Sequence, residues 1–290
     1  QNTMLYLQDS TAQLDGAGSK VDMDVADGYT GAYISGNSQL TGVRKIKLGQ
    51  GSTGLYLENT SPNFVSTAES ITGTKDNARG IVAKNSNFTN NSKISLSGKE
   101  SVGIYSDANT VLAINKGIIN AVKKSSAGML GKKGNIENTG TITTSAEESA
   151  VMYTENANAT NKNILNANGK KSAGIYVKLT EDNATVEGKN EGTNAVITTT
   201  AEQSAGMLGL LDGAINTSTL TLTNQNSIIV NAKETVGMMI TNDTTGIPTS
   251  NVRAVNTGTI DLNSSTTNKD NIGILANKRA TGINEKNINV

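Results

Sequence analysis

The sequence contains no cysteine, no histidine and no tryptophan, and only two of its 290 residues are proline. Without histidine or cysteine, the chain has no Ser-His-Asp triad, no cysteine nucleophile, no zinc site built from imidazole or thiolate, and no axial histidine for haem. Only carboxylate, hydroxyl, lysine or carbonyl chemistry remains. The lack of cysteine also excludes a disulfide framework. This fits a bacterial surface protein or a cytosolic protein better than a small secreted eukaryotic module.

An excess of charge of either sign is also missing, because 25 basic side chains balance 25 acidic ones and no basic run occurs. This balance argues against a nucleic-acid partner. No stretch approaches the run of about 18 apolar residues that a membrane-spanning helix needs, and Gln1-Asn2-Thr3 does not open a signal peptide. We therefore expect no nucleic-acid partner and no membrane insertion by this segment.

Large apolar residues are scarce as well, since Leu, Ile, Val and Phe make up only roughly a fifth of the chain, near the boundary of disorder. Asn, Thr, Ser, Gly and Ala dominate instead, and they suit turns and short strands better than helices. The periodicity of the sequence therefore has to decide the fold class.

A four-residue element of the form small-Gly-apolar-apolar recurs along the chain, most often at a step of 23 residues, as from Gly80 to Gly103. Two weaker copies are Gly31-Ala32-Tyr33 and Ala150-Val151-Met152-Tyr153, the latter with Val in the Gly slot. The full copies begin at Thr53, Arg79, Val102, Ala127, Ala173, Ala205, Val236 and Ile272.

A second element, an Asn followed four residues later by Ile or Leu, lies between the copies of the first. It begins at Asn90, Asn115, Asn138, Asn161, Asn224 and Asn256. Its third residue precedes the next Gly slot by 11 residues in five cases, as from Gly117 to Gly128. Two half-repeats locked in phase predict one coil that contains at least two short strands.

The fold predicted by these repeats is all-β, a right-handed parallel β-helix of about eleven coils. The apolar runs are too short for helical repeats, and leucine-rich repeats would need several fixed Leu in each unit. Stacked coils about 4.8 Å apart would bury Ile, Leu, Val and Met, and the right hand follows from the preference of parallel crossovers. We expect Ile104, Ile119, Ile142, Ile175 and Ile260 to point inward.

Three columns of the repeat have both a structural and a functional interpretation. Aligned Asn side chains predict a hydrogen-bonded ladder, favoured over a ligand-binding row. The second apolar slot often holds Tyr, as at Tyr153 and Tyr176, but also Leu or Met, which favours a packing column over an exposed stripe that stacks on sugars. A column before the Gly slot alternates in charge between Lys124 and Lys233, which predicts ion pairs between coils rather than a substrate-binding patch.

The tandem units resemble the passenger regions of the large type V autotransporter adhesins of fusobacteria, which include an arginine-inhibitable adhesin. Residues 138–142 with 149–153, and residues 161–165 with 172–176, carry the resemblance best, and it extends over about residues 30 to 280. The resemblance implies a β-helical passenger exported to the outer membrane and cell surface, and a role in adhesion to host cells or other bacteria. It also implies a membrane β-barrel outside the given chain, so residues 1–290 are expected to be a single β-helical segment of a longer passenger domain.

Polysaccharide lyases and hydrolases with a β-helical fold are the enzymatic alternative, and they need clustered carboxylates, usually with Ca²⁺ or a catalytic Lys or Arg. Asp22, Asp24 and Asp27 come closest to such a cluster, but a solvated strand end is favoured over a cation site there. We therefore expect no metal, no cofactor and no enzymatic activity. A surface adhesin segment that binds a protein or glycan receptor is favoured, and a purely structural stalk is the other alternative.

The binding surface is predicted from coil length. From the Gly slot to the third residue of the Asn element, compact coils have 12 residues, as from Gly80 to Ser92, whereas three consecutive later coils have 18, 20 and 21. The extra residues, about 178–189, 210–222 and 241–253, should stack into one lateral protrusion, although drift in loop length would also explain them. The candidate binding residues are Lys178, Glu181, Asp182, Glu187, Leu210, Leu211, Asp212, Asp243, Pro248 and Arg253.

Overall fold

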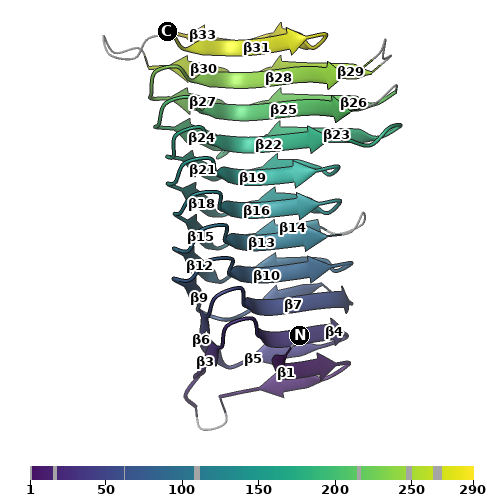
Figure 1. The fold of residues 1–290 in the computed structure, drawn as a ribbon, viewed down its shortest axis with the longest axis vertical. Coiled ribbons are helices and arrows are strands. Elements are labelled where there is room, and N and C mark those ends of the chain that lie inside the picture. The colour runs from purple at the N-terminus through teal and green to yellow at the C-terminus, as the bar shows by residue number, and fades with distance from the viewer. Residues whose placement is uncertain are drawn as a thin grey trace.

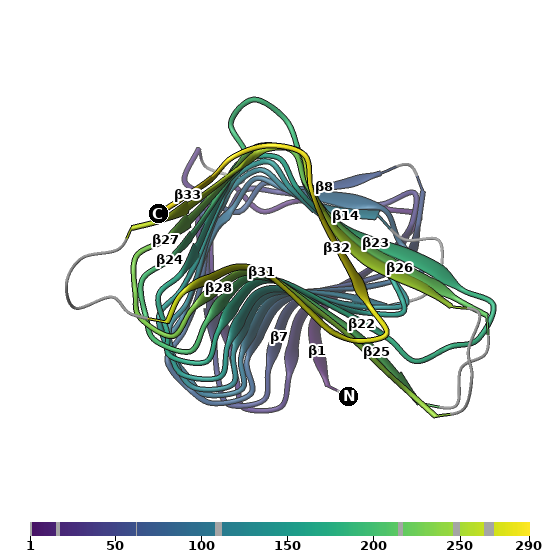
Figure 2. The same cartoon turned by 90° about the horizontal axis from the view of Figure 1, so that it is seen from above.

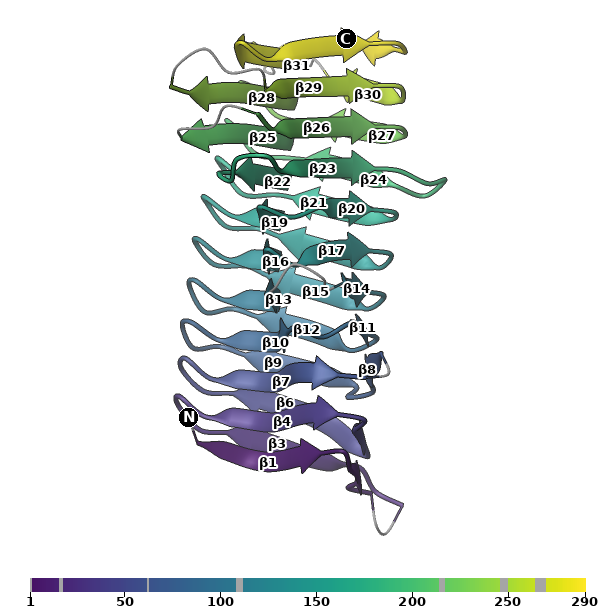
Figure 3. The same cartoon turned by 90° about the vertical axis from the view of Figure 1, so that its right-hand side faces the viewer.

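The computed structural model describes residues 2–15, 18–61, 63–107, 112–213, 217–245, 250–263 and 270–290, and all regular elements in these ranges are β-strands. The chain winds around one axis in eleven coils, from the N-terminus at the lower end of Figure 1 to the C-terminus at its upper end. Figure 3 shows the coils from the side, stacked into one continuous rod. The predicted all-β solenoid is thus confirmed, with the predicted number of coils.

Each coil contributes one strand to each of three parallel sheets, which we call sheets 1, 2 and 3 in the order in which the chain passes through them. Sheet 1 has eleven strands: β1 (Thr3–Gln8), β4 (Thr30–Gly36), β7 (Thr53–Thr60), β10 (Arg79–Lys84), β13 (Val102–Asp107), β16 (Ala127–Lys132), β19 (Ala150–Glu155), β22 (Ala173–Leu179), β25 (Ala205–Gly213), β28 (Val236–Thr244) and β31 (Ile272–Lys278).

Sheet 2 begins with a separate pair, β2 (Thr11–Gln13) and β5 (Gln39–Thr41). Nine further strands follow: β8 (Phe64–Ser66), β11 (Phe88–Asn90), β14 (Leu112–Asn115), β17 (Asn135–Asn138), β20 (Ala159–Asn161), β23 (Thr185–Asn190), β26 (Thr219–Asn224), β29 (Asn251–Asn256) and β32 (Thr281–Asn284). Sheet 3 again has eleven: β3 (Val21–Val25), β6 (Val43–Leu48), β9 (Ser70–Gly73), β12 (Lys93–Leu96), β15 (Ile118–Ala121), β18 (Thr141–Thr144), β21 (Ile164–Ala167), β24 (Val196–Thr199), β27 (Ser227–Val230), β30 (Thr259–Leu262) and β33 (Ile288–Asn289).

The helix is right-handed, as expected for parallel strands joined by crossovers. Figure 2 views the rod from the C-terminal end, and the last coil passes counterclockwise from β31 through β32 to β33 as the chain advances toward the viewer. The two repeated sequence elements mark the start of each sheet 1 strand and the turn from sheet 2 to sheet 3. In the compact coils from β11 to β20, the strands of sheet 2 are marked in the sequence only at their last residue, which is the Asn of the second element.

The core is a continuous column of apolar side chains inside the rod. The five isoleucines expected to point inward, Ile104, Ile119, Ile142, Ile175 and Ile260, have no exposed surface. Apolar burial on this scale is the main force that holds a solenoid together, and here every coil shares it with its neighbours.

The glycines of the repeat are needed because two groups lie close to that position: an isoleucine of sheet 3, and the backbone carbonyl oxygen of the Gly-slot residue one coil further on, which a Cβ on Gly128 would approach to 2.7 Å. A Cβ on Gly128 would lie 2.2 Å from Cγ2 of Ile142, and a Cβ on Gly174 would lie 2.4 Å from Cγ2 of Ile197. The same Gly-Ile contact recurs in each coil from β7 to β31 except the coil of β19. That coil has Val151 in the Gly slot, and its sheet 3 strand has Leu165 where the others have Ile. Val is tolerated in the Gly slot of this coil because Leu165 is not branched at Cβ and therefore has no Cγ2 methyl group to collide with it.

Because Val151 pairs with Leu165 where the other coils pair Gly with Ile, we expect substitutions at these two positions of a coil to be energetically coupled. Gly128→Val should lower the free energy of unfolding by about 1–3 kcal/mol, since overpacking displaces core side chains. Adding Ile142→Leu should recover part of the loss, because the pair then matches Val151 with Leu165. Urea unfolding of the single and double variants measures the coupling. Strictly additive losses would contradict this explanation of the glycine column.

The predicted Asn ladder is present inside the rod, where the chain turns from sheet 2 to sheet 3. Nδ2 of each Asn donates to Oδ1 of the Asn one coil further on, at 2.7–2.9 Å. The ladder also includes Asn190, which does not fit the sequence pattern, and Asn284, which fits it with Ile288 four residues later. Its complete course is Asn90, Asn115, Asn138, Asn161, Asn190, Asn224, Asn256 and Asn284. Because both ends of each amide are used, the column stabilises the turn rather than offering free groups to a ligand.

Asn161 is a sensitive point of this ladder. It is fully buried, donates to Asn190 at 2.8 Å and accepts from Asn138 at 2.9 Å. Asn161→Asp keeps the size but leaves Oδ1 of Asn190 facing another oxygen, and we expect a loss of about 2–3 kcal/mol at pH 7. Acidification should recover part of it, because burial raises the pKa of the new carboxyl and its protonated form can donate. The matched control is Asn166→Asp on the outer face of sheet 3, and equal losses from both would exclude the ladder as the cause.

Charged side chains pair between coils, as predicted from the alternating column. Glu202 accepts from Lys170 at 3.3 Å and from Lys233 at 3.1 Å, which links three successive coils. Both lysines lower the pKa of Glu202, Lys233 more strongly. Near the N-terminus, Arg44 and Asp22 form another pair between neighbouring coils. The guanidinium group of Arg44 donates two hydrogen bonds to the carboxylate of Asp22, at 2.7 and 2.8 Å. Asp22, one of the three carboxylates that come closest to a cation cluster in the sequence, is therefore paired with a side chain of the neighbouring strand.

Candidate functional site: a lateral ridge and an outer groove

The three long coils build a ridge on one side of the rod, visible at the lower right of Figure 2. Their extra residues lengthen strands as well as turns: β25 and β28 have nine residues, whereas β16 in a compact coil has six. The strands remain in register across the ridge, with Lys178 beside Leu210 in sheet 1 and Thr221 beside Arg253 in sheet 2. The insertions therefore lie side by side on one face of the solenoid.

The ridge has its own apolar interior. Leu179 and Leu211 of sheet 1 are fully buried, and so is Leu220 of sheet 2, with Val186 and Val252 nearly so. Leu211, a candidate binding residue, is therefore buried and cannot contact a receptor, so its prediction as a binding residue was wrong. Strand alternation is the reason, because Leu210 points outward and its neighbour must then point inward. The insertions thus extend the core and form a stiff ridge.

The sheet 1 face of the ridge carries ion pairs. Nζ of Lys178 lies 3.0 Å from a carboxylate oxygen of Asp212, and this contact raises the pKa of Lys178. Asp243, beside Asp212 in register, pairs with Lys278. The two adjacent carboxylates, Asp212 and Asp243, are each paired with a lysine. The sheet 1 face of the ridge therefore carries many charges, but its net charge is close to zero.

Glu181 and Asp182 lie in the turn at the tip of the first long coil. Glu181 pairs with Lys133 of a lower coil, and this raises the pKa of the lysine. Oδ1 of Asp182 accepts the backbone N–H groups of Asn183 at 2.9 Å and Thr217 at 2.8 Å. These carboxylates fasten the tip to its neighbours and fix its shape.

Glu187 and Arg253 lie on the opposite, sheet 2 face of the ridge, where they border a hollow of about 390 Å³ that threonines also line. Glu187 pairs with Lys189 at 3.0 Å and accepts the hydroxyl of Thr223 at 3.0 Å. The ten predicted residues therefore do not form one patch. They are divided between two faces and the interior, and Pro248 lies outside the described residues.

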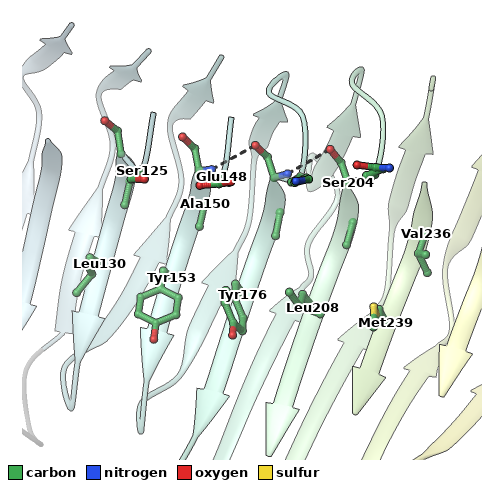
Figure 4. Close-up of a pocket in the computed structure, with 18 of the residues that line it drawn as sticks. Ser125, Leu130, Glu148, Ala150, Tyr153, Tyr176, Ser204, Leu208, Val236 and Met239 are labelled. Carbon is green, nitrogen blue, oxygen red and sulfur yellow. Dashed lines mark hydrogen bonds between the residues drawn. The ribbon is translucent and has the colours of Figure 1, made fainter. Parts of the chain in front are cut away.

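A groove on the outer face of sheet 1 was not predicted as a site. It has a volume of about 550 Å³ and runs across five coils, from β16 to β28. Its floor consists of two columns, a small one that includes Ala150 and Ala173 and a large one of Leu130, Tyr153, Tyr176, Leu208 and Met239. The turns before sheet 1 form one wall (Figure 4). The tyrosine column of the sequence therefore faces outward, partly exposed, and does not belong to the core.

The tyrosines of this column differ in how their rings meet. At the N-terminal end, the rings of Tyr6, Tyr33 and Tyr56 stack face to face, with centroids 5.0 and 5.5 Å apart. In the groove, the rings of Tyr153 and Tyr176 meet edge to face, at 69° and 5.0 Å. The hydroxyl of Tyr33 donates to Glu58, which is the main cause that raises the pKa of Tyr33 to about 12. Burial is the main cause that raises the pKa of Tyr153 and Tyr176.

A second charged column borders the far side of the tyrosines, and sequence reasoning missed it. It includes the in-register neighbours Glu58 and Lys84, whose side chains are 3.1 Å apart, and Glu155 and Lys178. Each of these residues stands four positions after the Gly slot. This constant spacing from the Gly slot could have revealed the charged column in the sequence. Lys178, chosen as a loop residue, is thus also part of this regular column.

No helix long and apolar enough to cross a bilayer occurs in the described part of the chain. Comparison with known proteins gave no family model that matches the chain, and no curated protein or solved structure that matches it significantly.

Proposed function

We propose that this chain is a non-enzymatic surface adhesin segment that attaches to a receptor on host cells or other bacteria through its lateral ridge. The observation that supports the proposal is the in-register stacking of three long coils into a ridge with a buried interior. A rigid, laterally projecting surface can hold binding groups in fixed positions at low conformational cost. The resemblance of the repeats to autotransporter passengers supports a location on a bacterial surface, as part of an exported passenger domain.

The ridge suits a macromolecular receptor. Its exposed carboxylates and lysines are held by neighbours, as in the pair of Lys178 and Asp212, so they are ordered before binding. Ordered rim charges mainly govern specificity and association rate, whereas affinity depends on apolar anchors. Leu210, which lies between Lys178 and Thr241 on the outer face, is the apolar residue suited to such an anchor.

The test is attachment of the purified segment, immobilised on beads, to epithelial cells and to bacteria of other species. We expect saturable binding that excess soluble segment displaces. A folded segment that binds neither cell type would contradict the proposal and favour the structural stalk. Release of reducing ends from surface glycans incubated with the segment would instead favour the β-helical lyase or hydrolase.

A further inference from the structure

The groove on the outer face of sheet 1 is separate from the ridge, although both use β22, β25 and β28. The groove lies near the beginnings of these strands and the ridge lies at their ends. The groove also crosses two compact coils, those of β16 and β19, which contribute nothing to the ridge. Adjacent strands are about 4.8 Å apart, so five coils give a trough about 19 Å long. Its volume falls in the range of ligand pockets.

The aromatic face inside the groove is open in a way that the N-terminal tyrosines are not. Stacking covers both faces of the Tyr33 ring, which lies between Tyr6 and Tyr56. Tyr153 instead has Leu130 on one side and the near-perpendicular ring of Tyr176 on the other. Figure 4 shows the Tyr153 ring broadside in the groove and the Tyr176 ring closer to edge-on. An open aromatic face next to small alanines suits a flat, partly apolar ring.

The groove does not select for charge. On its wall, Glu148 pairs with Lys124 at 3.2 Å, and Gln203 donates to Glu234 at 3.0 Å. Lys171 also lines the groove, and its formal positive charge offsets the negative charge of Glu234. The wall thus offers donors and acceptors of hydrogen bonds without net charge, which matches a neutral ligand rich in hydroxyl groups.

We propose that this groove binds a neutral oligosaccharide, with one pyranose ring stacked on Tyr153 and its hydroxyl groups hydrogen-bonded to side chains of the wall. The C–H groups of a pyranose face meet the negative face of the phenol ring, and the equatorial hydroxyls reach the polar groups beside it. The length of the trough accommodates several linked sugars along the rod axis. The site does not depend on the proposed role of the ridge.

The test is isothermal titration calorimetry of the full chain with neutral tetrasaccharides of glucose, galactose and N-acetylglucosamine, and with a tetrasaccharide of hyaluronan as the acidic comparison. At least one neutral tetrasaccharide should bind with Kd of about 1 mM or tighter. Tyr153→Leu should weaken that binding about tenfold, because it removes the aromatic face. The substitution copies Leu130 and Leu208 of the same column, so the variant should fold. Tyr153→Phe, which keeps the ring, should bind like the unaltered chain.

Tyr33→Ala is the matched control, because its ring is covered and lies outside the groove. It should leave oligosaccharide binding unchanged. The proposal is overturned if no neutral tetrasaccharide binds, if the acidic one binds more tightly, or if Tyr153→Leu binds as well as the original chain. Self-association that Tyr153→Leu abolishes would overturn it in favour of a second copy as the occupant. If the unaltered chain binds the oligosaccharide but does not attach to cells, that result would count against the proposed role of the ridge and not against the groove.

Discussion

Replacing Ile142 by Asp is expected to lower the free energy of unfolding by roughly 3–5 kcal/mol, because it leaves a charge without a partner in the core. Ile142 has no exposed surface, lies between Ile119 and Leu165 in sheet 3 and packs on Gly128. In a solenoid the damage spreads to both neighbouring coils, since each coil is stable only through its interfaces. Urea unfolding followed by circular dichroism measures the loss.

The matched control is Thr143→Asp, the same new side chain one residue further along β18. Thr143 points away from the core, and its hydroxyl only accepts the amide of Asn166, an acceptor role that a carboxylate preserves. We expect a change within about 0.5 kcal/mol there, as is usual for surface substitutions. Similar losses from the two variants would show that β18 does not alternate between core and solvent as described.

Shortening the three long coils to the compact spacing is expected to abolish attachment to cells while the rod stays folded. The deletion must remove both arms of all three coils together, because Leu179 and Leu211 are buried in the interior that Val186 and Leu220 also line. Removing one arm would expose apolar surface, whereas removing all of them leaves compact coils like those of β16 and β19. Bead attachment to cells and thermal unfolding are measured on the same preparation.

Two further variants separate binding from folding. Leu210→Asp with Lys178→Glu changes only side chains on the outer face of the ridge and should reduce attachment at least tenfold. Lys93 is an exposed residue of sheet 3, away from the ridge, and Lys93→Ala should have no effect on attachment. If the trimmed chain melts like the original and still attaches, the ridge is not the receptor site, and the segment acts through another surface or as a stalk.

Much of the fold could be predicted from the sequence because its determinants are local and repeat. From β7 onward the Gly slot marks where the sheet 1 strand approaches sheet 3, and from β11 onward an Asn marks each turn into sheet 3. A coil that buries one face must repeat these features at a nearly constant spacing, so they are visible in a single chain. Asn190 escaped detection because a longer turn separates it from Val196, and the pattern then has the wrong length.

The functional surfaces were less predictable, because they depend on which face of a strand each side chain takes. Their place in an inserted segment made both Leu210 and Leu211 candidate binding residues, but the continued strand places them on opposite sides. Glu187 and Arg253 lie away from Lys178 because the chain passes from sheet 1 to sheet 2 between them, so candidate residues from the same insertions lie on different faces of the ridge.

The sequence by itself therefore determined the coil: its length, its inward isoleucines, its Asn ladder and the ion pairs between neighbours. Only the tertiary structure decided that the insertions form a ridge with a core and that the tyrosine column faces outward over a groove. The physical reason is the range of the interactions. The interior of a coil is specified within about 23 residues of chain, whereas a groove exists only where side chains from five stacked coils come together.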